Sequence, residues 1–267
     1  MTDWLTVARG SAPLIVSVPH TGTEIPGHVA GLRSIAGALH DADHHIDRLY
    51  GFAADMGATI VRTAISRTVI DVNRDPSGAS LYPGQATTGL CPETTFAGVP
   101  LYHPGSTPDA AEIEARRIAY FDPYHAALTA EIARLRARHP AIIVYDSHSI
   151  LSRVPRLFDG ELPQFNIGTF DGASCDVGLA AAVAAACDSE SLVINGRFKG
   201  GWITRRYGDP SGGVHAIQME LAMRGYLDEN SAWPPPWEAA RAAPLQQTLH
   251  QIIAATLSFA SSQSERR

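Results

Sequence analysis

Leu14-Ile15-Val16-Ser17-Val18-Pro19-His20-Thr21-Gly22 is the stretch of sequence that decides the fold. It begins with aliphatic, largely β-branched residues, a pattern typical of a strand buried on both faces of a sheet. Pro19 lacks a backbone donor and therefore ends the strand. Ligands of open α/β sheets bind beyond the carboxyl ends of the strands, so His20 is a candidate ligand or catalyst.

The composition is that of a globular protein, and it leaves a small anionic substrate possible, because a few arginines can outweigh a mild net negative charge. Its 267 residues, 45% of them hydrophobic, are enough for one large core, and we find no repeat or linker. We therefore expect residues 1–267 to form a single domain. The net charge of −6 argues against nucleic acid as a partner, because non-specific binding needs a basic face. The sequence carries no indication of an oligomeric state.

Cysteine usage and hydropathy predict a cytoplasmic protein. The three cysteines, Cys91, Cys175 and Cys187, are odd in number and far apart, so they predict neither a disulfide framework nor a cysteine zinc site. Residues 1–4 show no basic and then apolar leader. The longest apolar run, 177–187, is too short to cross a bilayer. We expect no attachment to a membrane.

Strand-like and helix-like segments alternate along the chain, which predicts an α/β fold. Further strands are expected at 59–65, 69–73, 141–145, 165–169, 191–195 and 215–221. Helices are expected at 37–56, 107–139 with a break at 122–123, 176–187 and 244–259. Residues 76–104 are rich in Gly, Pro and Thr and predict a long ordered loop, of a length that is usually functional.

Two histidines and an aspartate at the ends of these elements predict a metal site. His20 and His148 each follow a predicted strand, and Asp43 lies near the start of a predicted helix. Two imidazoles and one carboxylate are a usual ligand set of catalytic zinc, and they suit Zn²⁺ better than Mg²⁺ or Ca²⁺. Spacing alone leaves the third ligand open between Asp43, Glu24 and His45.

Glu220 is the candidate general base. It stands near the end of the otherwise apolar strand 215–221, where a buried carboxylate is costly unless it is paired or functional. Next to a metal it would accept a proton from the metal's water and later give it to a leaving amine. The alternative is a structural ion pair with Arg205, Arg206 or Arg224.

Several polar residues near strand ends and glycine turns are candidates for binding an anion. The guanidinium fork of arginine matches a carboxylate, and glycines let the backbone approach a ligand closely. The set predicts a substrate with one or two carboxylates. Its members are Arg67, Asn73, Arg74, Arg197 and Lys199.

Taken together, these motifs resemble the N-formylglutamate amidohydrolase (N-formylglutamate deformylase) family of histidine breakdown. The resemblance covers about residues 14–226 and rests on nine pieces in one colinear order. They are Val18-Pro19-His20-Thr21-Gly22, Asp146-Ser147-His148-Ser149, and the segments 43–50, 67–74, 81–84, 88–90, 195–201, 204–208 and 214–221.

The resemblance implies a three-layer α/β/α sandwich around a mixed, mostly parallel sheet, as in the more distantly similar zinc carboxypeptidases and aspartoacylases. It implies that His20 and His148 bind one zinc ion per chain, or another divalent transition metal in its place. It also implies that Asn73 and Arg74 grip a substrate carboxylate and that Glu220 is the base.

The third metal ligand is a point of departure from those distant relatives. They place a glutamate three residues after the first histidine, where this chain has Thr23. The amidohydrolase family has an aspartate that matches Asp43, so the resemblance favours Asp43.

The activity that the resemblance implies is zinc-dependent hydrolysis of N-formyl-L-glutamate to L-glutamate and formate, the last step of a histidine degradation route. One rival is a deacylase of another N-acyl amino acid, or a carboxypeptidase-like hydrolase. The other rival, of a different class, is a non-catalytic binder of acidic metabolites, which would bind its ligand without turnover.

Overall fold

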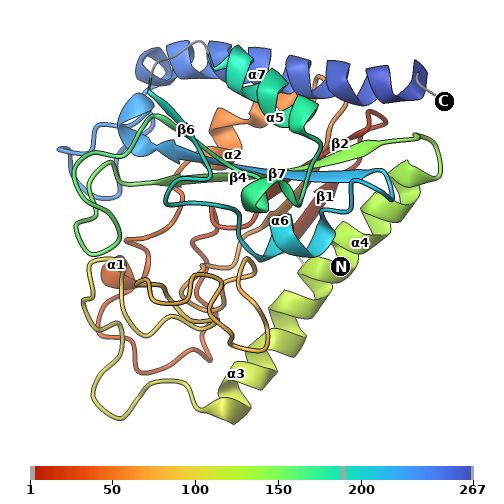
Figure 1. Ribbon diagram of the computed structural model, residues 1–267. Helices are drawn as coiled ribbons and strands as arrows, with labels where there is room; N and C mark the ends of the chain where they lie inside the picture. The colour runs from red at the N-terminus through yellow and green to blue at the C-terminus, as the bar shows by residue number, and fades with distance from the viewer. Residues whose placement is uncertain (1–3, 188–190, 266–267) are drawn as a thin grey trace.

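The computed structural model describes residues 4–187 and 191–265, which surround one seven-stranded sheet (Figure 1). Its strands are β1 (Leu5–Ala8), β2 (Leu14–Val18), β3 (Thr59–Thr63), β4 (Ile142–Ile150), β5 (Phe165–Gly168), β6 (Leu192–Ile194) and β7 (Val214–Ala222). They lie in the order β1-β3-β2-β4-β7-β5-β6. β2, β3, β4 and β7 run parallel to one another, while β1 and β5 pair antiparallel with β3 and β7. The sheet is thus mixed and mostly parallel, as predicted.

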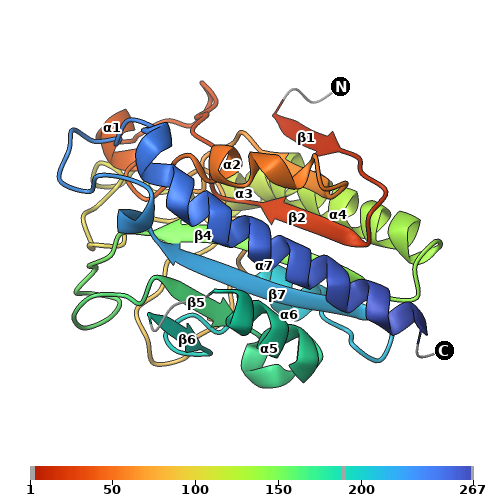
Figure 2. The ribbon, with the colours of Figure 1, turned by 90° about the horizontal axis from the view of Figure 1, so that it is seen from above.

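Helices cover both faces of this sheet, which confirms the predicted α/β/α layering (Figure 1 and Figure 2). One face carries α2 (Ile46–Leu49), α5 (Val177–Ala186) and α7 (Ala239–Glu265), and the other carries α4 (Asp122–Arg136) and α6 (Trp202–Tyr207). The other helical segments are α1 (Ile35–Ala38), α3 (Ala110–Arg116), a π-helical turn (Arg117–Phe121), and 3-10 turns at Gly51–Ala53, Phe170–Gly172 and Met223–Gly225. In the described part of the chain, none of these helices has the length and apolar character of a membrane span.

The central strand β2 shows why its sequence is an unbroken apolar run. Leu14 and Val16 pack into the hydrophobic cluster beneath α5 and α7, whereas Ile15 packs into the cluster beneath α4. All three side chains are fully buried, and each such burial stabilises the fold by roughly 1.5–3 kcal/mol. After β2, Gly22 lies so close to residues 64–65 that a Cβ there would be 2.4 Å from the Ile65 carbonyl oxygen.

Most of the other predicted elements are confirmed with small shifts of their ends. The strands predicted at 59–65, 165–169, 191–195 and 215–221 and the helix predicted at 176–187 are present as β3, β5, β6, β7 and α5. The predicted loop at 76–104 is also present: between β3 and α3 the described chain forms no regular helix or strand. This long loop lies on the α4 side of the sheet (Figure 1).

The predicted strand at 69–73 is wrong, because this segment forms buried turns. The amides of Val69 and Ile70 both donate to the Ser66 carbonyl, and the amide of Asn73 donates to the Asp71 carboxylate at 2.9 Å. These local bonds fold the segment into turns, and the Asp71 amide donates to the Leu90 carbonyl of the long loop, not to a strand of the sheet. The segment is apolar because it is enclosed on all sides, and its sequence therefore has the same pattern as a buried strand.

The single helix predicted at 37–56 is also wrong. The structure has α1, α2 and a 3-10 turn there, separated by a turn over 40–45. His45 adopts a left-handed conformation with φ of 62°, which a continuous helix does not allow. The turn brings the Asp43 amide to 2.9 Å from the His20 carbonyl oxygen. The break in the helix thus places the two predicted site residues Asp43 and His20 side by side.

Three further boundaries differ from the prediction. β4 continues to Ile150, so His148 lies within the strand and not beyond it. The break expected near 122–123 is a π-helical turn just before it, because Pro123 has no amide with which to continue the regular bonding. α7 begins at Ala239, before the predicted start, and contains Pro244.

A pH-dependent test of the fold concerns His125 on α4, whose ring lies 2.8 Å from the Val72 carbonyl oxygen and 2.8 Å from the Tyr207 hydroxyl. Burial lowers the pKa of His125 from 6.5 to about 4. The unfolded chain therefore binds this proton first, and stability is lost as the pH falls below about 6.5. We expect this residue to account for roughly 1–2 kcal/mol of the loss between pH 7 and pH 5.

The measurement is the free energy of unfolding in urea at both pH values. His125→Gln should show the smaller loss on acidification, although it is less stable at pH 7. His28→Gln, which changes an exposed histidine, serves as the matched control. Equal losses in the two variants would contradict the assignment.

Candidate active site

Three predicted ligand residues meet at the carboxyl ends of the parallel strands. His20 follows β2, Asp43 lies in the turn before α2, and His148 lies in β4. One ligand atom from each of these residues lies within 4.8 Å of the other two, and all three side chains are buried. We refer to His20, Asp43 and His148 as the His-Asp-His group.

The structure brings neither alternative third ligand into this group. Glu24 is exposed, and its backbone forms an isolated bridge with Ile65. The His45 ring lies 2.9 Å from the Pro235 carbonyl oxygen and packs against Trp237. Of the three residues that the sequence left open, only Asp43 lies beside both histidines.

The carboxylate of Asp43 has one paired and one unpaired oxygen. Its Oδ2 accepts a hydrogen bond from the Ser149 amide and lies 3.1 Å from His148 Nδ1. Its Oδ1 is buried without a hydrogen-bond partner, and Nη1 of Arg67 is 3.5 Å away. A buried polar atom without a partner requires an explanation, and a bound cation is one.

Two fully buried carboxylates orient the histidines. Nε2 of His20 lies 2.7 Å from Asp71 Oδ1, and Nε2 of His148 lies 3.0 Å from Asp146 Oδ2. The Nδ1 atoms of the two rings lie 3.7 and 3.1 Å from Asp43 Oδ2. Metal-binding histidines generally donate their second ring N–H to such a carboxylate. Both Nδ1 atoms therefore face Asp43, although Arg67 Nη1 lies 3.0 Å from His20 Nδ1 and would have to give way to a bound metal.

The protonation of the group also fits a divalent cation. Burial and the charge of Arg67 lower the pKa of His20 to about 4, so its ring is neutral at pH 7, as a ligand must be. Burial lowers the pKa of His148, but Asp146 and Asp43 outweigh it and raise that pKa well above its usual range. This positive charge balances the carboxylates, and a cation in the group would take over that function. Two imidazole nitrogens and a carboxylate oxygen fit Zn²⁺.

The His-Asp-His group borders a pocket, which His20 and His148 help to line. Glu220 lines the same pocket from β7, directly opposite His148 in β4. Burial, reinforced by the charge of Asp43, raises the pKa of Glu220 to about 8. A structural ion pair is not formed with Arg205, whose Nε donates to the Gly200 carbonyl, or with Arg224, which binds Ser152 and Glu161.

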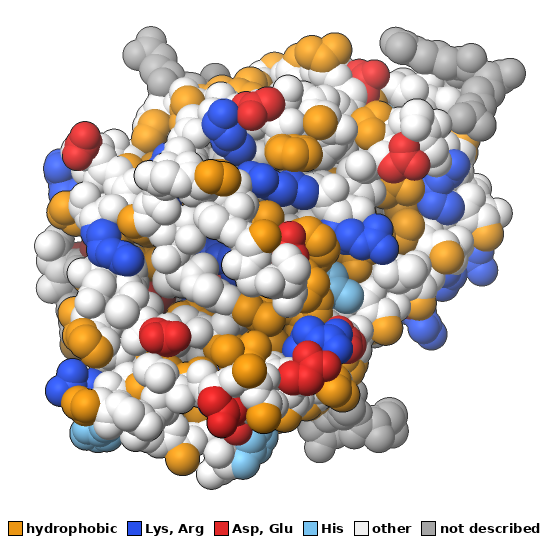
Figure 3. Space-filling view, turned by 60° about the horizontal axis from the view of Figure 1, so that its bottom comes forward, with side chains coloured by type: hydrophobic (Ala, Val, Ile, Leu, Met, Phe, Trp, Pro, Cys, Tyr) orange, Lys and Arg blue, Asp and Glu red, His pale blue; other side chains and the backbone are white. Residues whose placement is uncertain are grey.

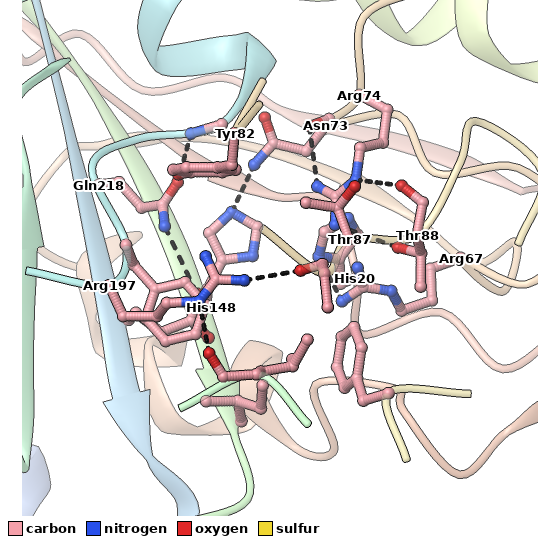
Figure 4. Close-up of a pocket in the computed structure, with 17 residues that line it drawn as sticks. His20, Arg67, Asn73, Arg74, Tyr82, Thr87, Thr88, His148, Arg197 and Gln218 are labelled. Atoms are coloured by element: carbon pink, nitrogen blue, oxygen red, sulfur yellow. Dashed lines mark hydrogen bonds between the residues drawn. The ribbon is translucent and has the colours of Figure 1, made fainter. Parts of the chain in front are cut away.

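Four of the predicted anion-binding residues line the pocket, and three of them are the cations Arg67, Arg74 and Arg197. Arg74 donates to the carbonyl and hydroxyl of Thr88, and Arg197 donates to the carbonyls of Leu157 and Ala86. Arg67 and Arg197 approach the pocket from opposite sides (Figure 4). On the molecular face in Figure 3, basic and acidic side chains are interspersed, whereas the pocket gathers cations.

The other two members of that set lie differently. Asn73 lines the pocket, but its Nδ2 donates to Asp146 Oδ2 and its Oδ1 accepts from the Ile203 amide, so its amide helps to position His148. Lys199 is not brought to the pocket, because its Nζ pairs with the Asp171 carboxylate at 3.0 Å on the surface.

Several residues of the site were missed from the sequence. Asp71 and Asp146 were detectable as carboxylates within apolar runs, although their pairing with histidines was not. The long loop supplies Tyr82, Thr87, Thr88 and Phe96, and Gln218 and Ile150 come from β7 and β4. Tyr82 and Thr88 lie in segments that the family resemblance covers, whereas the length of the loop was the only sequence signal for Thr87 and Phe96.

Comparisons with known proteins match most of the chain to one protein family. A family model described as N-formylglutamate amidohydrolase matches residues 12–227. A protein of Pseudomonas aeruginosa named N-formylglutamate deformylase is 46% identical over 260 residues, covering 95% of this chain and 97% of its own. A protein of the same name from Pseudomonas putida is 43% identical over 270 residues, covering 100% of both.

Solved structures agree on the fold. The crystal structure of N-formylglutamate amidohydrolase from Ralstonia eutropha JMP134 has a TM-score of 0.80 and 24% identity, covering 99% of both chains. A gene product from Agrobacterium tumefaciens has a TM-score of 0.70 and 20% identity, covering 96% of this chain and 95% of that one.

Zinc binding provides a test of the His-Asp-His group. We expect Asp43→Asn and His148→Ala to lower the affinity for Zn²⁺ at least about 100-fold, more than the loss of an outer partner usually costs. Glu24→Ala and His45→Ala should bind zinc like the parent chain, because neither side chain reaches the group. The measurement is isothermal titration with Zn²⁺, with circular dichroism as the control for folding. A folded Asp43→Asn variant with parental affinity would exclude Asp43 as a ligand.

Proposed function

The chain belongs to the N-formylglutamate amidohydrolase family, and we propose that it hydrolyses N-formyl-L-glutamate to L-glutamate and formate. The observation that carries this proposal is the juxtaposition of the His-Asp-His group with Glu220 in a pocket that contains three arginines. The names of the two Pseudomonas relatives support the same substrate. In the reaction, the formyl C–N bond breaks, the oxygen of water bonds to the formyl carbon, and the amine gains a proton.

We propose that His20, Asp43 and His148 hold one zinc ion, or another divalent transition metal. When bound, such an ion supplies a Lewis acid that polarises the formyl carbonyl and lowers the pKa of a water molecule. The chain keeps the ligands in place through Asp71 and Asp146, which fix the orientations of the two rings.

Glu220 moves the proton in this proposal. Its carboxylate is buried beside the His-Asp-His group, and its raised pKa of about 8 lies close to neutral pH. A group with such a pKa accepts and releases a proton with little cost in either direction. Glu220 therefore takes the proton from the attacking water and gives it to the amine nitrogen of the departing glutamate.

The arginines bind and orient the substrate. Arg74 and Arg197 are held by loop atoms on the pocket wall and bind the two carboxylates of the substrate, which aligns the formyl group. Arg67 lies beside the His-Asp-His group, with Nη1 3.0 Å from His20 Nδ1. Its charge stabilises the negative charge that develops on the formyl oxygen.

We also propose that the protein acts in the cytoplasm, at the last step of a histidine degradation route. The family resemblance supports the route. The cysteines Cys91, Cys175 and Cys187 are buried and free, which is usual in a reducing compartment.

The direct test is formate release from N-formyl-L-glutamate before chelation, after chelation and after Zn²⁺ is restored. We expect activity to disappear and to return, and Glu220→Gln to lower kcat by roughly 10²- to 10⁴-fold while zinc stays bound. Release that chelation does not affect would refute the metal dependence. If zinc binds but no formate appears, the substrate assignment fails.

Substrate anchoring is tested with two cations from the predicted set, only one of which lines the pocket. Arg74→Met should raise KM roughly 5- to 150-fold, the effect of losing about 1–3 kcal/mol from a charged hydrogen bond. Lys199→Met removes a surface charge outside the pocket and should leave KM within about twofold. A larger rise of KM in Lys199→Met than in Arg74→Met would show that Lys199, and not Arg74, anchors the substrate. The measurement is steady-state kinetics on N-formyl-L-glutamate.

A further inference from the structure

The pocket ends in a thin apolar wall with a second cavity behind it. Phe96 and Ile150 line the pocket, and the same two side chains also line a neighbouring cavity. Leu151, Val154 and Met223 also line that cavity, together with the polar residues His40, Asp41 and Arg153. No other residue is shared between the two linings in the described part of the chain.

The strands show which end of the pocket this wall closes. β4 and β7 are in register, so three pairs of residues follow one another along the same face: Asp146 with Gln218, His148 with Glu220, and Ile150 with Ala222. The middle pair belongs to the reaction site. The first pair is polar, and the third pair is apolar.

Arg74, one of the two proposed carboxylate anchors, lies near the polar pair. Asp146 accepts from Asn73, the neighbour of Arg74, and Gln218 accepts from the Gly201 amide at 2.7 Å. The scissile C–N bond separates the dicarboxylate part of the substrate from its acyl part. With one substrate carboxylate on Arg74, an acyl substituent directed along the strands away from Arg74 would meet Ile150 and Phe96.

Both side chains of the wall are held in place. The Phe96 ring packs on the guanidinium of Arg67, with 4.7 Å between Cζ and the ring centroid, and its backbone amide donates to the Asp41 carboxylate. Ile150 is buried in a small cluster with Val154 and Ala222. The wall is therefore a fixed boundary of the pocket.

We infer that Phe96 and Ile150 determine acyl specificity by closing the acyl end of the pocket. The substituent of a formyl group is a single hydrogen, which fits in front of the wall. Longer acyl groups need the volume that the second cavity holds behind it. The inference rests on the proposed deformylase function, because it assigns the acyl side of that reaction.

The test measures glutamate release, a product common to N-formyl-, N-acetyl- and N-butanoyl-L-glutamate. The parent chain should prefer the formyl substrate. In Phe96→Ala and Ile150→Ala, the ratio of kcat/KM for the butanoyl to the formyl substrate should rise about 10- to 100-fold, the scale on which hydrophobic pockets discriminate small apolar groups. A ratio within one variant cancels any general loss of activity caused by uncovering Arg67.

Two controls isolate the wall. Thr87→Ala enlarges the pocket away from the cluster that holds Ile150, and Val154→Ala enlarges only the second cavity, so both should keep the parental ratio. An equal rise in these controls would show general loosening and overturn the inference. If Phe96→Ala does not fold, as judged by circular dichroism, Ile150→Ala decides the question, because it opens the same wall without touching Arg67.

The same experiment distinguishes a failure of the proposed deformylase function from a failure of the inference on acyl specificity. A parent chain that releases glutamate from none of the three substrates refutes the proposed function and, with it, this inference. A parent chain that deformylates while folded wall variants keep its ratio overturns the inference alone. The same holds if the parent chain accepts the butanoyl and formyl substrates equally.

Discussion

The structure depends on the compensation of buried charge at the carboxyl ends of the central strands. Asp43, Asp71 and Asp146 are almost completely buried, and isolated carboxylates in such a position would be strongly destabilising. His20, His148 and Arg67 lie among them at hydrogen-bonding or ion-pair distance. This network joins β2, β4 and the irregular segments 40–45 and 66–74, so the same contacts that permit burial also assemble the site.

The register of the parallel strands determines where the side chains of the proposed reaction site lie. The parallel pairing of β4 with β7 sets His148 opposite Glu220, and β2 ends beside them with His20. The strands thus present polar residues to the arginines and apolar residues to the wall formed by Phe96 and Ile150. A shift by one residue would turn all of these side chains to the opposite face, beneath α7.

The long loop at 76–104 and the turns at 66–74 complete the pocket, and neither segment forms a regular helix or strand. Residues 66–74 carry Arg67, Asp71 and Arg74 in buried turns whose backbone bonds are partly local and partly to distant segments, such as the Asp71 amide to the Leu90 carbonyl. A strand would place alternate side chains on opposite faces, and these three side chains would then not converge. The interruption of the helix predicted at 37–56 has the same effect, because it brings Asp43 to His20.

The sequence by itself determined the α/β architecture, most of the strands and the residue types of the site, because buried strands and strand-end histidines leave local patterns. Tertiary structure alone decided the partners. The pairing of Asp71 with His20 and of Asp146 with His148, the choice of Asp43 over Glu24 and His45, and the position of Lys199 outside the pocket depend on contacts between distant segments. Local periodicity also misread 69–73 and 37–56, because burial on all sides gives turns the same apolar pattern as strands and helices, and only packing distinguishes them.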